Sequence, residues 1–193
     1  MPLSDPLSVV RKATNIFEKA GIRYLVGGSL ASSLHGIPRS TQDVDIVADL
    51  NVQQVENILP LLSEHFYVDE EMAKDAVMRR SSFNVIDREL LYKLDIFVLS
   101  DDALAETEMK RRVGYRLADS DDQTMYVCSA EDIVAHKLYW YRLGDGVSER
   151  QWNDALNVVK VQREHLDMDY LTRTCSARGV GDLLEKLLKE YKT

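Results

Sequence analysis

The chain has 193 residues, which is enough for one domain with a buried core and a modest additional segment. Hydrophobic residues make up 45% of it, yet no apolar run approaches the roughly 20 residues of a membrane-spanning helix, so no membrane partner is expected. The formal net charge of −8 gives no sign of a general nucleic-acid-binding surface, because such surfaces are basic.

Apolar periodicity predicts alternating helices and strands up to about residue 128. Helices are expected at 7–20, 29–36, 52–63 and 102–112, and strands at 22–26, 43–50, 81–87, 91–99, 113–119 and 124–129. Residues 64–80 leave a choice between helix and loop after a short strand near Phe66 to Val68. From Ser129 onward the pattern is helical to the end. We therefore predict an α+β fold, with a mixed-sheet domain at 1–128 and a C-terminal helical bundle at 129–193 that packs on it.

A glycine turn joins the expected strand at 22–26 to the next helix. It reads Val26-Gly27-Gly28-Ser29. Consecutive glycines allow close approach of the backbone to a phosphate, and the N–H groups at the start of a helix attract anions. The same sequence also fits a plain tight turn.

Asp43 and Asp45 flank Val44 at the start of a predicted strand. Alternate strand residues point to the same face, so the two carboxylates project together. They repel each other unless a cation or a proton lies between them, and Mg²⁺ prefers such oxygen ligands. The other interpretation is a solvated strand edge.

Asp95 interrupts an otherwise apolar strand, between Leu94 and Ile96. Carboxylates are rarely buried without a partner. Its partner is either a metal shared with the strand of Asp43 and Asp45, or a basic side chain such as Lys93 or Arg88.

Taken together, these motifs resemble the signature of the DNA polymerase beta-like nucleotidyltransferase superfamily. Gly-Gly-Ser is followed after 13 residues by Asp-hydrophobic-Asp-hydrophobic, and then by an Asp on a later strand. The resemblance implies a nucleotidyltransferase fold in which Gly27, Gly28 and Ser29 hold a nucleoside triphosphate. It further implies that Asp43, Asp45 and Asp95 bind two Mg²⁺ ions, with Mn²⁺ as an alternative, and that Asp95 is a ligand or a base.

Three further segments resemble AbiEii-type toxin nucleotidyltransferases. They are GGSLASSLHGIPRSTQDVDIV, EDIVAHKLYWYR and ERQWNDALNV. This likeness makes Arg39, Thr41 and Lys137 candidate nucleotide-binding residues, and it adds Lys137 and Asp154 to the candidate catalytic residues. It also implies a toxin of a toxin-antitoxin pair, with a cognate antitoxin as a partner.

Helical geometry bears on Lys137 and Asp154 separately. Lys137 falls within the apolar face of its helix, so its ammonium needs a carboxylate or a triphosphate as partner unless the side chain extends to solvent. Asp154 is expected opposite the apolar residues of its own helix, where it is either solvated or lines a cleft.

The function predicted from these residues is transfer of a nucleoside monophosphate to an acceptor hydroxyl on RNA, protein or a small molecule, with release of pyrophosphate. The alternative is a non-catalytic nucleotide- or partner-binding module on the same fold. Cys128 and Cys175 are isolated in sequence, and the N-terminus has no basic region followed by an apolar stretch. A cytoplasmic location is therefore expected.

Overall fold

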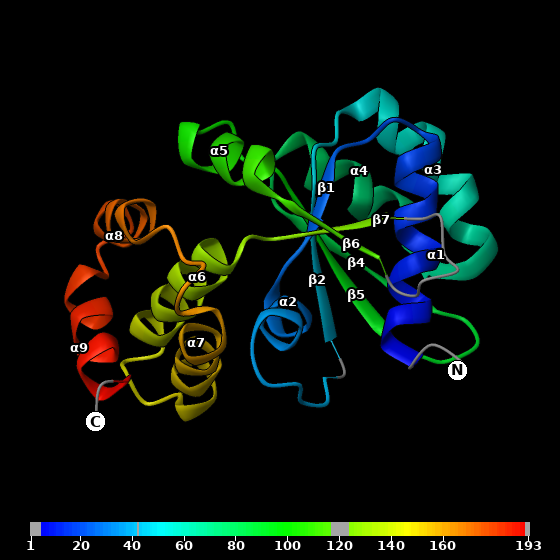
Figure 1. The fold of residues 1–193 in the computed structure, drawn as a ribbon. Helices are drawn as coiled ribbons and strands as arrows, with labels where there is room; N and C mark the ends of the chain where they lie inside the picture. The colour runs from blue at the N-terminus through cyan, green and yellow to red at the C-terminus, as the bar shows by residue number, and fades with distance from the viewer. Residues whose placement is uncertain (1–4, 42, 117–123, 192–193) are drawn as a thin grey trace. The chain divides into compact units, whose positions relative to one another are not determined.

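The structure is a computed structural model that describes residues 5–41, 43–116 and 124–191. Its helices are α1 (Asp5–Lys19), α2 (Gly28–His35), α3 (Val52–His65), α4 (Glu70–Met78), α5 (Ala103–Arg111), α6 (Ala130–Leu143), α7 (Glu149–Gln162), α8 (Met168–Ala177) and α9 (Gly181–Tyr191). Its strands are β1 (Tyr24–Val26), β2 (Asp43–Ala48), β3 (Phe66–Val68), β4 (Ser82–Asp87), β5 (Lys93–Val98), β6 (Val113–Arg116) and β7 (Thr124–Val127). The predicted α+β class is confirmed (Figure 1).

The chain forms two compact units. The sheet unit comprises residues 1–27 and 41–127, and the helical unit comprises residues 28–40 and 128–193. The sequence interpretation divided the chain once, after residue 128. The structure divides it there and also groups α2 and the loop after it with the C-terminal helices, because α2 packs on α6 and α7.

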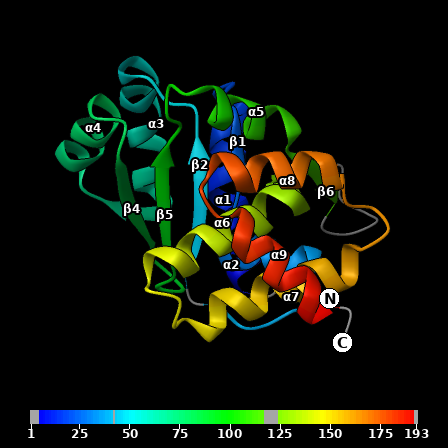
Figure 2. The ribbon, with the colours of Figure 1, turned by 90° about the vertical axis from the view of Figure 1, so that its left-hand side faces the viewer.

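The described strands form one mixed sheet in the order β3-β4-β5-β2-β1-β7-β6. β2 pairs in parallel with β5, and β1 pairs in parallel with β7, while the other neighbours are antiparallel. Figure 2 shows β4, β5 and β2 side by side. Residues 117–119 of the strand predicted at 113–119 lie outside the described residues.

Alternation along the strands separates the core of the sheet unit from its more accessible face. Val44, Ile46 and Ala48 of β2 are fully buried, whereas the residues between them are exposed or half-buried. Figure 1 shows α1, α3 and α4 on one side of the sheet. Their buried apolar side chains complete this core, and Phe17 of α1 is fully buried among them.

Local signals in the sequence account for several helix starts. Asn51 forms the predicted N-cap of α3, since its side chain accepts a hydrogen bond from the backbone N–H of Gln54. Ser129 caps α6 in the same way. The ambiguous segment 64–80 forms β3 and α4, and Asp69 caps α4. No helix in the described part of the chain is long and apolar enough to cross a membrane.

Candidate active site

The parallel pairing of β2 with β5 brings the three predicted metal ligands onto one face of the sheet unit. In this register Asp45 is opposite Asp95, and Asp43 is opposite Lys93. Asp43 and Asp45 are two positions apart on one strand, so all three carboxylates project from the same face. We call Asp43, Asp45 and Asp95 the carboxylate face.

Lys93 supplies a positive charge within this face. Its Nζ lies 2.7 Å from Oδ2 of Asp95 and 3.9 Å from Oδ1 of Asp43. The hydrogen bond to Asp95, followed by the charges of Asp95, Asp43 and Asp45, raises the pKa of Lys93 and outweighs the opposing effect of burial. Of the two partners for Asp95 left open above, the structure therefore places the basic side chain beside it.

The carboxylate face has the donor chemistry that Mg²⁺ requires, because carboxylate oxygens are its preferred protein ligands. Among the described residues, however, no three His, Cys, Asp or Glu side chains converge in a ready-made metal site. The ammonium of Lys93 stands where a cation would neutralise Asp95. The residue types and the shared face fit a divalent ion, provided that the side chains rearrange around it.

The glycine turn begins beside the carboxylate face. The backbone N–H of Gly27 donates to the carbonyl oxygen of Asp45 at 2.8 Å. Gly28 has a φ of +57°, a left-handed conformation that glycine adopts without strain, and it opens α2. On the β2 side, the hydroxyl of Thr41 donates to the carbonyl oxygen of Asp43 at 2.8 Å and so shapes the start of the strand.

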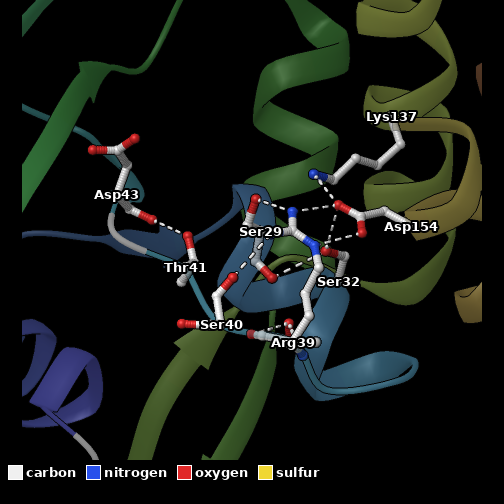
Figure 3. Close-up of polar contacts among 9 residues, drawn as sticks. Ser29, Ser32, Arg39, Ser40, Thr41, Asp43, Lys137 and Asp154 are labelled. Carbon is white, nitrogen blue, oxygen red and sulfur yellow. Dashed lines mark hydrogen bonds and ion pairs between the residues drawn. The ribbon is translucent and has the colours of Figure 1, made fainter. Parts of the chain in front are cut away.

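The helical unit brings Arg39, Lys137 and Asp154 together, as Figure 3 shows. Nη2 of Arg39 and Nζ of Lys137 each lie 2.8 Å from Oδ2 of Asp154. Arg39 also donates through Nη2 to the hydroxyl of Ser29 at 2.6 Å. The hydroxyl of Ser32 lies 3.3 Å from Oδ2 of Asp154. We call these five residues the buried-aspartate cluster.

Asp154 does not lie on a solvated face, which was one of the two alternatives that the sequence left open. Its side chain is 7% exposed and that of Lys137 is 5% exposed. The reason is that α7 packs against both α2 and α6, which leaves the polar side of α7 covered as well. Burial alone would raise the pKa of Asp154, but its hydrogen bonds to Arg39 and Lys137 hold that pKa below its ordinary value.

The buried-aspartate cluster carries two cationic side chains and one anionic side chain, and therefore one excess positive charge. The bond to Asp154 raises the pKa of Arg39, which keeps the guanidinium charged at any physiological pH. Such a cluster can bind an anion. Among the described residues, Asp154 bonds to Arg39, Lys137 and Ser32 of this cluster, an arrangement that positions the two basic side chains.

Sequence reasoning missed two polar neighbours of these groups. Asn84 of β4 is opposite Asp95 in the antiparallel register and is exposed. Ser32 joins the buried-aspartate cluster from α2. Both depend on strand register or helix packing, and the sequence carries no separate signal for either.

A separate pocket of about 410 Å³ lies in the helical unit, between α6, α7 and α9. It is lined by Tyr141, Gly146, Val147, Glu149, Trp152, Asn153 and Lys186, none of which was a predicted site residue. The ring of Tyr141 lies 5.1 Å from that of Trp152, and Nζ of Lys186 lies 4.9 Å from the Trp152 ring centre. The side chains that line the pocket thus contact one another, and the two rings are tilted at 48°.

Comparison with protein-family models gives no match, and no curated protein matches the chain in sequence. Solved structures do match. The complex of ANT(2'')-Ia with adenylyl-2''-tobramycin aligns with a TM-score of 0.57 at 14% identity, covering 91% of this chain and 97% of the other. An antigenic nucleotidyltransferase-like protein from Paracoccidioides brasiliensis aligns with a TM-score of 0.56 at 15% identity, covering 95% and 93%.

The solution structure of the antibiotic-resistance factor ANT(2'')-Ia also aligns, with a TM-score of 0.54 at 16% identity over 96% of this chain and 97% of the other. These alignments extend over nearly the whole of each chain. The chain therefore has the nucleotidyltransferase fold, as the sequence motifs predicted. At identities this low, the likeness shows the fold alone.

Proposed function

We propose that the protein is a metal-dependent nucleotidyltransferase, which moves a nucleoside monophosphate from a nucleoside triphosphate to an acceptor hydroxyl and releases pyrophosphate. One observation carries the proposal. Asp43, Asp45 and Asp95 share one face of β2 and β5, and the turn that starts at Gly27 is hydrogen-bonded to the backbone of Asp45. This chain shares its fold with ANT(2'')-Ia, which was solved with an adenylylated tobramycin. That likeness supports the same class of reaction.

Each group of residues has a role in this proposal. The three carboxylates would hold Mg²⁺, or Mn²⁺ in its place, with two ions expected. When bound, such ions offset phosphate charge and stabilise the entering and leaving oxygens. Asp95 accepts the proton of the acceptor hydroxyl. The N–H groups of the glycine turn and the hydroxyl of Ser29 donate to the triphosphate, whose charge Arg39 and Lys137 offset.

Two classes of acceptor have support from different observations. The adenylylated tobramycin bound to ANT(2'')-Ia favours a small molecule with hydroxyl groups. The motif likeness to AbiEii-type toxins favours RNA or a protein hydroxyl, and with it a cognate antitoxin. Both acceptors present the same nucleophile, so the chemistry of the carboxylate face is unchanged between them.

The test uses nucleoside triphosphates labelled at the α-phosphate, each incubated with the full-length protein and Mg²⁺. The acceptors are total RNA, a protein lysate and an aminoglycoside in separate reactions. We expect label on one class of acceptor together with release of pyrophosphate, and we expect a chelator to stop both. Asp45→Asn lowers turnover by at least about 10²-fold, because it removes a carboxylate that would hold the metal ions, and these ions stabilise the developing charge.

Asp75→Asn is the matched control, because it removes an exposed carboxylate of α4 that pairs with Arg79. Its turnover is expected to equal that of the wild type. Retained turnover in a folded Asp45→Asn variant contradicts the proposal. Metal-dependent binding of the nucleotide without any release of pyrophosphate identifies the protein as a non-catalytic binding module instead.

A further inference from the structure

Lys93 occupies an unusual place for a basic side chain, within the carboxylate face itself. It is two positions before Asp95 on β5 and directly opposite Asp43 of β2. Its ammonium donates to Oδ2 of Asp95 at 2.7 Å and lies 3.9 Å from Oδ1 of Asp43. The ammonium thus links the carboxylates of two neighbouring strands.

The charges of this face explain why such a link matters. Three carboxylates on one face repel one another, and this repulsion disfavours their close approach in the absence of a cation. Lys93 reduces their summed charge from about −3 to about −2. The ammonium is not itself a metal ligand, because it has no lone pair. A divalent ion bound to Oδ2 of Asp95 would lie close to this positive charge and be repelled by it, so Lys93 and the ion compete for the same carboxylate.

The Lys93 side chain is able to leave. It is 41% exposed, whereas Lys137 of the buried-aspartate cluster is 5% exposed. A lysine has a long flexible stem, and its ammonium is strongly hydrated once it leaves the site. Moving its head into solvent is therefore far less costly than moving a buried lysine.

We propose that Lys93 is a built-in counter-ion of the carboxylate face, which a divalent cation must displace from Asp95 in order to bind. The inference rests on the proposed function, because it assumes that the carboxylates take up metal. Lys93 offsets part of the repulsion among the carboxylates when no metal is present. It also weakens the affinity for metal, so a higher concentration of the free ion is needed to load the protein.

The test is calorimetric titration of the full-length protein with Mn²⁺ alone, in the absence of nucleotide. Lys93→Met keeps the length of the side chain but removes its charge, and we expect Mn²⁺ to bind about tenfold more tightly. Lys93→Arg keeps the charge and stays near the wild-type affinity. Lys110→Met removes an exposed lysine that pairs with Glu106 of α5, and it leaves the affinity unchanged.

A second measurement separates charge competition from general disturbance of the fold. Without metal, Lys93→Met is expected to melt at a lower temperature than the wild type. Saturating Mn²⁺ is expected to raise the melting temperature of Lys93→Met by more than it raises that of the wild type. If Lys93→Met binds Mn²⁺ no more tightly than the wild type, the counter-ion role is wrong.

Asp45→Asn distinguishes failure of this inference from failure of the proposed function. If the wild type binds Mn²⁺ and Asp45→Asn does not, the metal site exists, and the Lys93 variants alone decide the inference. If no variant shows binding that depends on Asp45, then the carboxylate face takes up no metal, and both proposals are overturned.

Discussion

Asp154 illustrates how a single buried carboxylate can organise two basic side chains. It accepts hydrogen bonds from Nε and Nη2 of Arg39, an arrangement that fixes the plane of the guanidinium. It also pairs with Lys137, which is itself buried. Loss of one partner from such a group leaves an uncompensated buried charge, which is strongly destabilising. The negative charge of Asp154 is therefore a structural requirement of the cluster as well as a means of positioning Arg39.

His35 gives a prediction for the pH dependence of stability. Its ring is buried in the helical unit, with Nε2 2.7 Å from the carbonyl oxygen of Cys128. Burial lowers the pKa of His35, although the hydrogen bond and the charge of Glu131 oppose this effect. In the unfolded chain His35 has the ordinary histidine pKa of about 6.5, so it gains a proton as the pH falls below that value, whereas in the folded protein it gains the proton only at lower pH. The free energy of unfolding therefore falls with decreasing pH.

The measurement is urea unfolding of the wild type and His35→Gln between pH 7.5 and pH 5.5. The wild type is expected to lose free energy of unfolding more steeply than the variant, with a difference in slope of no more than about 1.4 kcal/mol per pH unit. Glutamine keeps a donor for the Cys128 carbonyl but has no proton to gain. Parallel slopes for the two proteins would show that His35 is protonated equally in both states.

At this scale the sequence predicted the residue types well and their partners poorly. The spacing of Asp43 and Asp45 correctly predicted a shared face, because strand alternation is a local property. Lys93 was one of two basic partners considered for Asp95. The pairing of Lys137 with Asp154 joins two different helices, and nothing local to either segment indicates it. Whether Asp154 is solvated or lines a cleft was left open for the same reason.

Helix α2 packs closely against α7 in the helical unit. At Gly36, just after α2, an added Cβ would lie 3.0 Å from the backbone N of Val158 and 2.9 Å from the carbonyl oxygen of Ser32. Both neighbours are backbone atoms, which cannot move aside as a flexible side chain can. We expect Gly36→Ala to push α2 away from α7 and to destabilise the protein by roughly 1–3 kcal/mol in denaturant unfolding.

Gly144→Ala is a matched control, because an added Cβ there comes no closer than 3.5 Å to its nearest neighbour, the carbonyl oxygen of Trp140. Its stability is expected to stay close to that of the wild type. If both variants unfold at the same denaturant concentration, the close approach of α2 and α7 does not determine stability.

The existence of the elements was easier to predict than their pairing. Most helices and strands form within a few residues of their expected positions, because apolar periodicity and capping residues are local features of the sequence. The register that sets Asp45 opposite Asp95 is not local, because it joins β2 and β5 across an intervening helix, strand, helix and strand. The apolar setting of Asp95 raised a shared metal as one of two alternatives, and the family resemblance also suggested that these two strands carry one site.

At the scale of the whole molecule, the helical unit is discontinuous in sequence. Residues 28–40 belong to it although they precede most of the sheet unit. A fragment of residues 128–193 lacks α2 and Arg39, so the faces of α6 and α7 that α2 covers are exposed. We expect this fragment to show weak near-ultraviolet circular dichroism and no cooperative melting. A synthetic peptide of residues 28–40 should restore part of both signals, whereas a scrambled peptide should not. Cooperative melting of the fragment alone would contradict the prediction.

The long separation between α2 and its partners also bears on how the protein is made. Ser32 and Asp154 meet across 122 positions of sequence, and the ribosome releases the chain from its N-terminus. The small-residue helix that follows the glycine turn therefore emerges long before α7 exists to receive it. During synthesis its apolar side has no native neighbour, and the last steps of folding must wait until nearly the entire polypeptide is free.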